Sequence, residues 1–295
     1  MLLGYRIERM VAMPKQLIVN ADDFGRHPLI DRAVAQGVER GLIRSATVMV
    51  TGAAFADAVA LARRTSELGM GIHFTLVNAK PVLPPAQIPS LVDPRTGELY
   101  PNHGVFVKRF LQGKIRLQDV QRECTAQLDR FLDTGLVPTH GDSHQHMHVL
   151  PGIIDVIIGL CLDHGIPALR IPAIPVSLAA TRPSNLGEQV GRLGLHVLAE
   201  RARKKARAAV LLVPDHFGGI VAGEAVDKRA LRTILLQLGE GTTEIMIHPG
   251  TDNKILIPAT QWDHDFEGEL AAATDPEILD LVREQGIQVG NFRDL

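Results

Sequence analysis

The chain has 295 residues, of which 45% are hydrophobic, and its mean hydropathy is +0.08, so it can bury a large core. Its 33 acidic and 31 basic residues leave a net charge of −2, so the charge gives no reason to expect a nucleic-acid partner. No run of about 18 uncharged apolar residues indicates a membrane span, and the two cysteines, Cys124 and Cys161, suit a reducing compartment. We therefore expect a cytoplasmic protein.

Residues 1–14 are predicted to be a short extension without a signal-peptide pattern, with Met13 as an alternative start. From there, short β-rich runs alternate with helical patterns, such as the apolar spacing of Ile30, Val34 and Val38 before Gly41. Strands are predicted near residues 16–20, 45–51, 70–77, 136–140, 167–171, 209–213, 243–247 and 286–292. This order predicts one domain over residues 1–295, a single α/β barrel of the TIM type, regular or distorted, with seven or eight strands.

Polar side chains follow the predicted strands, and parallel α/β folds build their sites at that edge. These residues are Asp22, Asp23, His73, His140, His144, Arg170, Asp215, His216, His248 and Asn291. Adjacent residues of a strand point to opposite faces, so Asp22 and Asp23 can share one site only if the backbone leaves strand geometry there.

The segment 139–148 holds four of the chain's 12 histidines, a density typical of metal sites or catalysis. By itself His73 reads as a buried core histidine, but a ligand set of one aspartate and two histidines is typical of catalytic metals. His146 and His148 are expected to support the site rather than to bind metal. His248 is expected to be either functional or loop-bracing, and Arg170 to hold a carboxylate or a substrate oxygen or to form a structural salt bridge.

Two segments do not fit the short connections of a minimal barrel. Residues 80–104 are rich in proline and predict a long ordered loop on the catalytic face, which could also act as a lid. Residues 192–207 carry six Arg or Lys residues against the single acid Glu200. This stretch predicts either a solvated basic helix or a peripheral membrane contact.

With these residues assembled, the chain resembles the YdjC/ChbG family of carbohydrate deacetylases. The resemblance implies a (β/α) barrel related to polysaccharide deacetylases and hydrolysis of an N-acetyl group from an N-acetylglucosamine-type sugar. Residues 80–85, 88–93 and 170–172 resemble a subgroup associated with hopanoid biosynthesis, which implies a hopanoid glycolipid substrate. The matching motifs are Asn-Ala-Asp-Asp-Phe-Gly at 20–25, Gly-Ile-His-Phe at 71–74, the histidine-rich run at 139–148, Ala-Leu-Arg at 168–170 and Ile-His-Pro at 247–249.

The family resemblance implies that Asp23, His73 and His144 bind one divalent metal ion and that Asp22 is the general base. Histidine ligands favour zinc, a mixed oxygen and nitrogen site admits magnesium, manganese or cobalt, and the resemblance favours magnesium. We expect His248 to be the general acid, because an imidazolium can protonate the leaving amine. Predicted substrate-binding residues are Arg170, Asp215 and His216. Gln145 differs from the family pattern, since relatives often have a third consecutive histidine at this position. The residues that support the metal ligands are therefore not predicted by the resemblance.

Three other functions stay open at this stage. Soluble chitooligosaccharides would need the same metal site and a different pocket. Phosphoester hydrolysis would favour a second metal. A non-catalytic sugar-binding barrel would need neither a base nor an acid. A homodimer is expected for an enzyme of this size.

Overall fold

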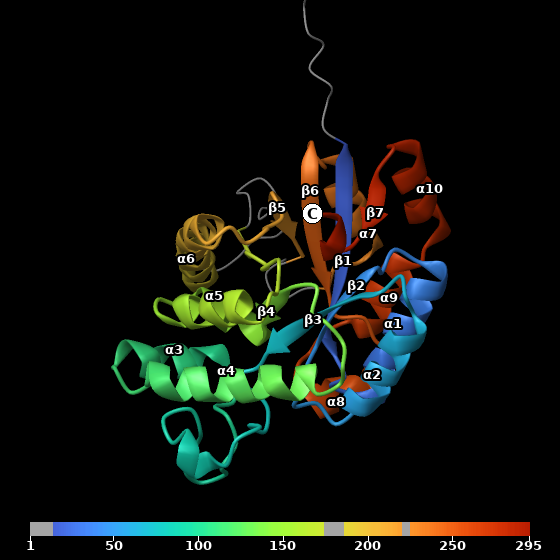
Figure 1. The fold of residues 1–295 in the computed structure, drawn as a ribbon. Helices are drawn as coiled ribbons and strands as arrows, with labels where there is room; N and C mark the ends of the chain where they lie inside the picture. The colour runs from blue at the N-terminus through green and yellow to red at the C-terminus, as the bar shows by residue number, and fades with distance from the viewer. Residues whose placement is uncertain (1–13, 174–185, 220–224) are drawn as a thin grey trace, which may run out of the picture.

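The computed structural model describes residues 14–173, 186–219 and 225–295, which form an α/β fold around a parallel sheet (Figure 1). The strands run in the order β4-β3-β2-β1-β6-β5, with β7 paired to β1. All pairs are parallel. The strands are β1 (Lys15–Phe24), β2 (Ser45–Val48), β3 (Gly69–Phe74), β4 (Gly141–Ser143), β5 (His216–Gly218), β6 (Gly241–Ile247) and β7 (Gln288–Gly290).

Helices cover the outer face of this curved sheet. In Figure 1, α1, α2, α9 and α10 lie to the right of the sheet and α3 to α6 lie to its left. None of the helices in the described ranges is both long and apolar enough to cross a membrane. The α-helices are α1 (Pro28–Arg40), α2 (Phe55–Arg64), α3 (His103–Leu111), α4 (Leu117–Leu132), α5 (Ile153–Asp163), α6 (Leu186–Ala208), α7 (Lys228–Leu236), α8 (Asn253–Thr260), α9 (Phe266–Ala273) and α10 (Pro276–Glu284). The 3₁₀-helices are η1 (Pro85–Gln87), η2 (His144–Val149) and η3 (Phe292–Asp294).

Strand alternation separates an apolar outer face from a polar inner face. On β1, Leu17, Val19 and Ala21 belong to the large apolar core, whereas Asn20 and Asp22 are buried polar residues. The inner space is therefore polar toward the carboxyl ends of the strands. Its other end is filled by a small apolar cluster of Ile18, Ala168 and Phe292.

Five of the eight predicted strands coincide with β1, β2, β3, β6 and β7. The other three were misplaced: β4 follows the predicted 136–140, and β5 follows the predicted 209–213. Residues 167–171 contribute only isolated bridges, Gly141 to Leu169 and Ala168 to Leu212. Pro167 and Pro172 flank that segment and have no N–H to donate to a ladder. The regular ladder is thus a partial barrel, and a full TIM barrel is not confirmed.

Gly71 provides a test of packing inside the sheet. A Cβ at Gly71 would lie 2.5 Å from two ring atoms of His140 and 2.8 Å from its carbonyl oxygen. We expect Gly71→Ala to lower the free energy of unfolding by about 1–3 kcal/mol in urea denaturation, because overpacking forces neighbours apart. Gly159→Ala is the matched control: nothing lies within 4 Å of its Cβ, and alanine should stabilise α5 by about 0.5–1 kcal/mol. If both substitutions changed the free energy of unfolding in the same direction, this account would be contradicted.

Candidate metal centre and active site

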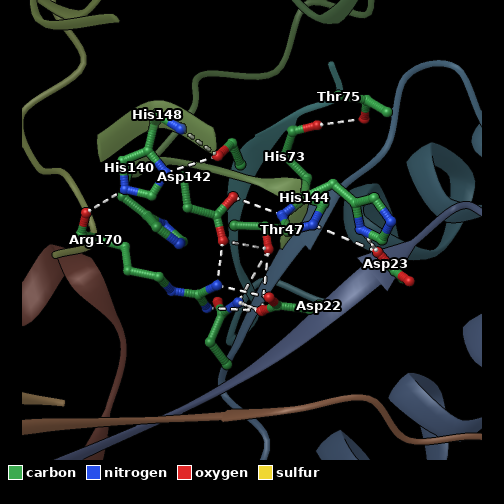
Figure 2. Close-up of polar contacts among 12 residues, drawn as sticks. Asp22, Asp23, Thr47, His73, Thr75, His140, Asp142, His144, His148 and Arg170 are labelled. Carbon is green, nitrogen blue, oxygen red and sulfur yellow. Dashed lines mark hydrogen bonds and ion pairs between the residues drawn. The ribbon is translucent and has the colours of Figure 1, made fainter. Parts of the chain in front are cut away.

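Asp22 and Asp23 share one site because the backbone turns between them. The pairing of β1 with β2 shifts register between Ala21 and Phe24, and Asp23 has a φ of 58°. This left-handed conformation breaks the alternation of side chains along the strand. The sequence analysis predicted such a break, because two adjacent strand residues otherwise point to opposite faces. Both carboxylates are buried, at 2% and 0% exposure, and Figure 2 shows them at the end of β1 beside His73 and His144.

The three predicted metal ligands converge. Oδ1 of Asp23 lies 2.9 Å from Nδ1 of His144 and 3.4 Å from Nε2 of His73, and one donor atom of each residue lies within 4.8 Å of the others. Within the described residues, Asp23 Oδ1 and His73 Nε2 are buried without a hydrogen-bond partner. A carboxylate and two imidazoles with unsatisfied buried atoms fit a divalent cation.

Local backbone geometry places each histidine. His73 lies on β3, and His144 begins η2 directly after β4. The chain then turns through Gln145 and His146, which have φ values of 53° and 58°. Non-glycine residues rarely adopt this region, so the turn is typical of a functional site. The Gln145 side chain accepts a hydrogen bond from the His103 backbone at 2.8 Å and lies beside His144.

Asp142 supports His73 from the neighbouring strand. Its Oδ1 lies 2.7 Å from His73 Nδ1, which leaves Nε2 free to bind a metal. Burial favours the neutral imidazole, but the Asp142 carboxylate outweighs it and raises the pKa of His73 to about 10. The sequence analysis did not assign a role to Asp142, although it lies inside the histidine-rich run and pairs with His73 in the ladder.

We expect Asp142→Asn to weaken divalent-metal binding about 10–100-fold, because the amide no longer raises the basicity of His73. Isothermal titration with Zn²⁺ measures this change in Kd. Asp155→Asn is the control, since Asp155 is exposed on α5 and pairs with Lys205. Equal Kd values for both variants would show that Asp142 does not support the metal site.

Arg170 lies at the centre of a buried charge network (Figure 2). It is fully buried and donates to both oxygens of Asp22 at 2.6 and 2.7 Å, and its Nε donates to Glu244 at 2.7 Å. Its Nη1 also lies 2.6 Å from Asp142 Oδ2. Burial opposes the charge, but the three carboxylates raise the pKa of Arg170 well above its usual value. This geometry favours the interpretation that Arg170 holds carboxylates over direct substrate binding.

Glu244 is a buried acid that the sequence analysis missed, because it lies in the middle of β6 rather than at the carboxyl end of the strand. It is fully buried, and its Oε2 has no partner in the described part of the chain. Burial raises the pKa of Glu244 to about 7, although Arg170 opposes this shift. Glu244 therefore anchors the arginine that orients Asp22.

His248 faces Asp22. Its Nε2 lies 4.0 Å from Asp22 Oδ2, and 13% of its side chain is exposed. The backbone N–H of His248 donates to Glu269, which fixes the turn after β6. Its ring stands edge-on to Trp262, with centroids 4.8 Å apart. Burial lowers the pKa of His248, with Asp22 the main opposing charge. The imidazole thus lies close to the Asp22 carboxylate and is the more exposed of the two groups.

The family described as YdjC-like protein matches residues 16–284 of the chain. The chain belongs to this family. It is 31% identical to a carbohydrate deacetylase of Geobacillus stearothermophilus, covering 96% of this chain and 98% of the relative. It is also 30% identical to a chitooligosaccharide deacetylase of an Enterobacter species, covering 96% and 100%. A solved structure from Enterococcus faecalis, described as a candidate cellobiose-phosphate cleavage protein, is similar with a TM-score of 0.76, 27% identity and coverage of 95% and 98%.

Asp215 and His216 do not join the other site residues of this YdjC-like chain. They were predicted to follow a strand, but β5 begins at His216 and pairs with β6 from Thr243 onward. Asp215 Oδ2 accepts from the Thr242 backbone at 3.0 Å, near the start of β6. Since parallel strands align their ends, both residues lie at the amino ends of the strands. The structure corrects the predicted strand boundary and does not support a substrate-binding role for either residue.

Two further histidines of the run have structural contacts. His148 is held by Ser143 Oγ at 2.7 Å and the Arg170 carbonyl oxygen at 3.0 Å. His140 stacks on Phe292 with ring centroids 3.5 Å apart. Burial lowers the pKa of His148 to about 4 and that of His140 to about 3, so both stay neutral.

The proline-rich segment 80–104 is tied to α4 by buried acids. Glu123 accepts hydrogen bonds from the backbone of Val82 at 2.8 Å and Leu83 at 3.1 Å, and Asp119 accepts one from Ser90 at 3.0 Å. Both acids are fully buried. These bonds satisfy carboxylates that would be costly to bury alone and fix the first half of the segment to the helix.

Proposed function

We propose that this protein is a divalent-metal-dependent hydrolase that removes the acetyl group from an N-acetylated amino sugar. The observation that carries the proposal is the convergence of Asp23, His73 and His144 beside Asp22, with His248 on the facing side. A metal-ligand set flanked by a base and an acid has the parts that amide hydrolysis needs. The names of the two deacetylase relatives support the same reaction.

The residues divide the reaction between them. A divalent ion held by Asp23, His73 and His144 supplies a Lewis acid that acidifies water and polarises the acetamide carbonyl. Asp22, oriented by Arg170, takes the proton of the attacking water. His248 then donates a proton to the nitrogen as the carbon–nitrogen bond breaks. The products are acetate and a free amino sugar.

The identity of the metal is part of the proposal. Two imidazoles and one carboxylate suit zinc, as in catalytic His/carboxylate sites, whereas the family resemblance favours magnesium. Reconstitution of metal-free protein with Mg²⁺ or Zn²⁺, followed by acetate measurement, separates the two.

The substrate has two candidates. The similarity of residues 80–85 and 88–93 to the hopanoid-associated subgroup supports a glycolipid, and the Enterobacter relative's name supports chitooligosaccharides. We propose the hopanoid-linked sugar as the substrate. The segment that carries this resemblance is fixed to α4, and Gln127 of α4 is hydrogen-bonded to the backbone of Thr75, directly after the site end of β3. The soluble sugar is the alternative.

The test is acetate release by the metal-loaded full chain from a GlcNAc-hopanoid and, in parallel, from chitobiose. Release from the hopanoid alone supports the glycolipid proposal, and release from chitobiose alone selects the alternative. Release from neither, with hydrolysis of phosphate esters, would replace deacetylation by phosphoester hydrolysis. Saturable glycan binding without any turnover would identify a sugar-binding barrel.

A peripheral membrane contact through residues 192–207 is also proposed. Two of its basic side chains are already bound to other parts of the protein. Lys205 pairs with Asp155 at 2.6 Å, and Arg203 donates to the Asp215 carbonyl oxygen at 2.8 Å. Within the described part of this stretch, Leu193, Val197, Arg201 and Lys204 are exposed and are proposed to carry the contact. Co-sedimentation with anionic liposomes that is unchanged in Arg201→Gln/Lys204→Gln would rule it out. The cytoplasmic location and the homodimer stay predictions.

A further inference from the structure

A second cluster of metal-ligating side chains lies beside the first site. His264 precedes α9, Glu269 lies on α9, and His248 follows β6. One donor atom of each residue lies within 4.8 Å of the others. His264 is 5% exposed and Glu269 2%. The cluster therefore joins three buried ligands that come from two separate elements.

His264 has no hydrogen-bond partner for either ring nitrogen among the described residues. An imidazole needs at least one donor or acceptor contact to repay its burial, so this side chain is unsatisfied. Its ring is nevertheless fixed, because it stacks on Trp262 with centroids 3.9 Å apart and an interplanar angle of 21°. A fixed, buried imidazole of this kind has a nitrogen lone pair that is available to a ligand.

The spacing within the cluster matches a coordination shell. His264 Nε2 lies 3.3 Å from Glu269 Oε2 without hydrogen-bond geometry. Two ligand atoms about 2.0–2.1 Å from a tetrahedral zinc ion lie about 3.3 Å apart. The pair His73 Nε2 and Asp23 Oδ1 of the first site has nearly the same separation, 3.4 Å.

Glu269 keeps the capacity to bind a cation. Its Oε1 accepts from the Val226 backbone at 2.6 Å and its Oε2 from the His248 backbone, but each carboxylate oxygen has two lone pairs. Oε2 is also the carboxylate atom that lies 3.3 Å from His264 Nε2, so Glu269 can share a cation with that ring.

We propose that His248, His264 and Glu269 form a second divalent-metal site, next to the site of Asp23, His73 and His144. Two histidines and one glutamate are the ligand set that zinc takes in several hydrolases, and zinc is the expected occupant. The ion would bind one nitrogen of the His264 ring and hold α9 against the end of β6.

Occupation of this second site has a consequence that rests on the proposed function. His248 cannot bind an ion and also carry the second proton that a general acid needs. We therefore expect zinc in excess of one equivalent to inhibit acetate release, whereas the first equivalent supports it. The second site would then limit activity when zinc is abundant.

The experiment counts zinc ions on the full chain, freed of metal, by isothermal titration and by metal analysis after dialysis. Wild type is expected to bind two ions and His264→Phe one, because phenylalanine keeps the packing on Trp262 but offers no nitrogen. His216→Phe, at the other end of the sheet, is the control and should bind two. A single ion on wild type, or two on His264→Phe, would overturn the proposal.

Asp23→Asn separates this proposal from the proposed function. It removes a ligand of the first site and should leave one zinc ion, bound at the second. Co²⁺ on this variant should show the intense visible absorption of a four-coordinate site, a readout that does not depend on the folding of His264→Phe. Absence of that band would overturn the second site. An Asp23→Asn chain that still binds two ions would instead contradict the first site.

Discussion

Asp22→Asn is expected to lower kcat for acetate release by about 10²–10⁴-fold, with little change in KM. Asparagine has the same shape as aspartate, but its amide cannot take the proton of the attacking water. The metal ligands Asp23, His73 and His144 are unchanged, so the affinity of the first site for its ion should stay near that of wild type. A steady-state assay of acetate release, with metal binding measured on the same preparation, checks both statements.

Asp23→Asn is the matched comparison, because it changes the neighbouring carboxylate in the same way. It should lose the ion of the first site together with activity, whereas Asp22→Asn should lose activity alone. The two adjacent aspartates then have separable roles. A kcat for Asp22→Asn within about threefold of wild type would show that another group takes the proton.

The site residues that could be predicted from the sequence are those that lie in a recognisable local pattern, such as the end of a strand or a cluster of histidines. The pleat of a strand alone shows that Asp22 and Asp23 need a break between them, and the structure has it as the positive φ of Asp23. The density of histidines in 139–148 likewise predicts ligands near His144. The α/β class with parallel strands follows from the alternation of strand and helix patterns, and the structure has it.

The remaining parts depend on register and packing, which one sequence does not encode locally. Arg170 meets Asp22, Asp142 and Glu244 because strand register brings distant segments to one level of the sheet. Asp215 was placed at the wrong end of a strand. The apolar run 209–213 ends at Pro214, and the strand forms after this proline, from His216 to Gly218, which the apolar run does not reveal.

The cluster of His264 and Glu269 was also missed, for a different reason. The sequence Trp-Asp-His-Asp-Phe-Glu at 262–267 has no metal-ligand spacing, and Glu269 acts on His248 only because α9 packs against the end of β6. Ligands that come from separate elements leave no local motif. The observation that reveals this cluster is a buried imidazole without a hydrogen-bond partner among the described residues, and it can be made only from the structure.

Arg170→Met is expected to lower the free energy of unfolding by about 3–5 kcal/mol and to abolish acetate release. Methionine fills part of the space but leaves the carboxylates of Asp22, Asp142 and Glu244 buried without their counter-ion, and breaking a buried ion pair costs this much. Asp22 also loses both of its bonds to the guanidinium. Urea denaturation at several pH values measures the loss. Arg203→Met is the control, since Arg203 donates mainly to backbone carbonyls and should cost about 1 kcal/mol or less.

The pH dependence distinguishes lost charge pairing from lost packing. In wild type the pKa of Glu244 is raised to about 7, so the stability that this group contributes is present below its ordinary pKa of about 4.5 and is lost as pH rises through 7. Arg170 holds the pKa of Asp142 below its usual value, so that contribution is present at neutral pH and is lost as pH falls. Removing the guanidinium raises both pKa values, and the deficit of Arg170→Met should therefore be larger at about pH 8 than at about pH 5. An equal deficit at both pH values would mean that Arg170 stabilises the fold by packing alone.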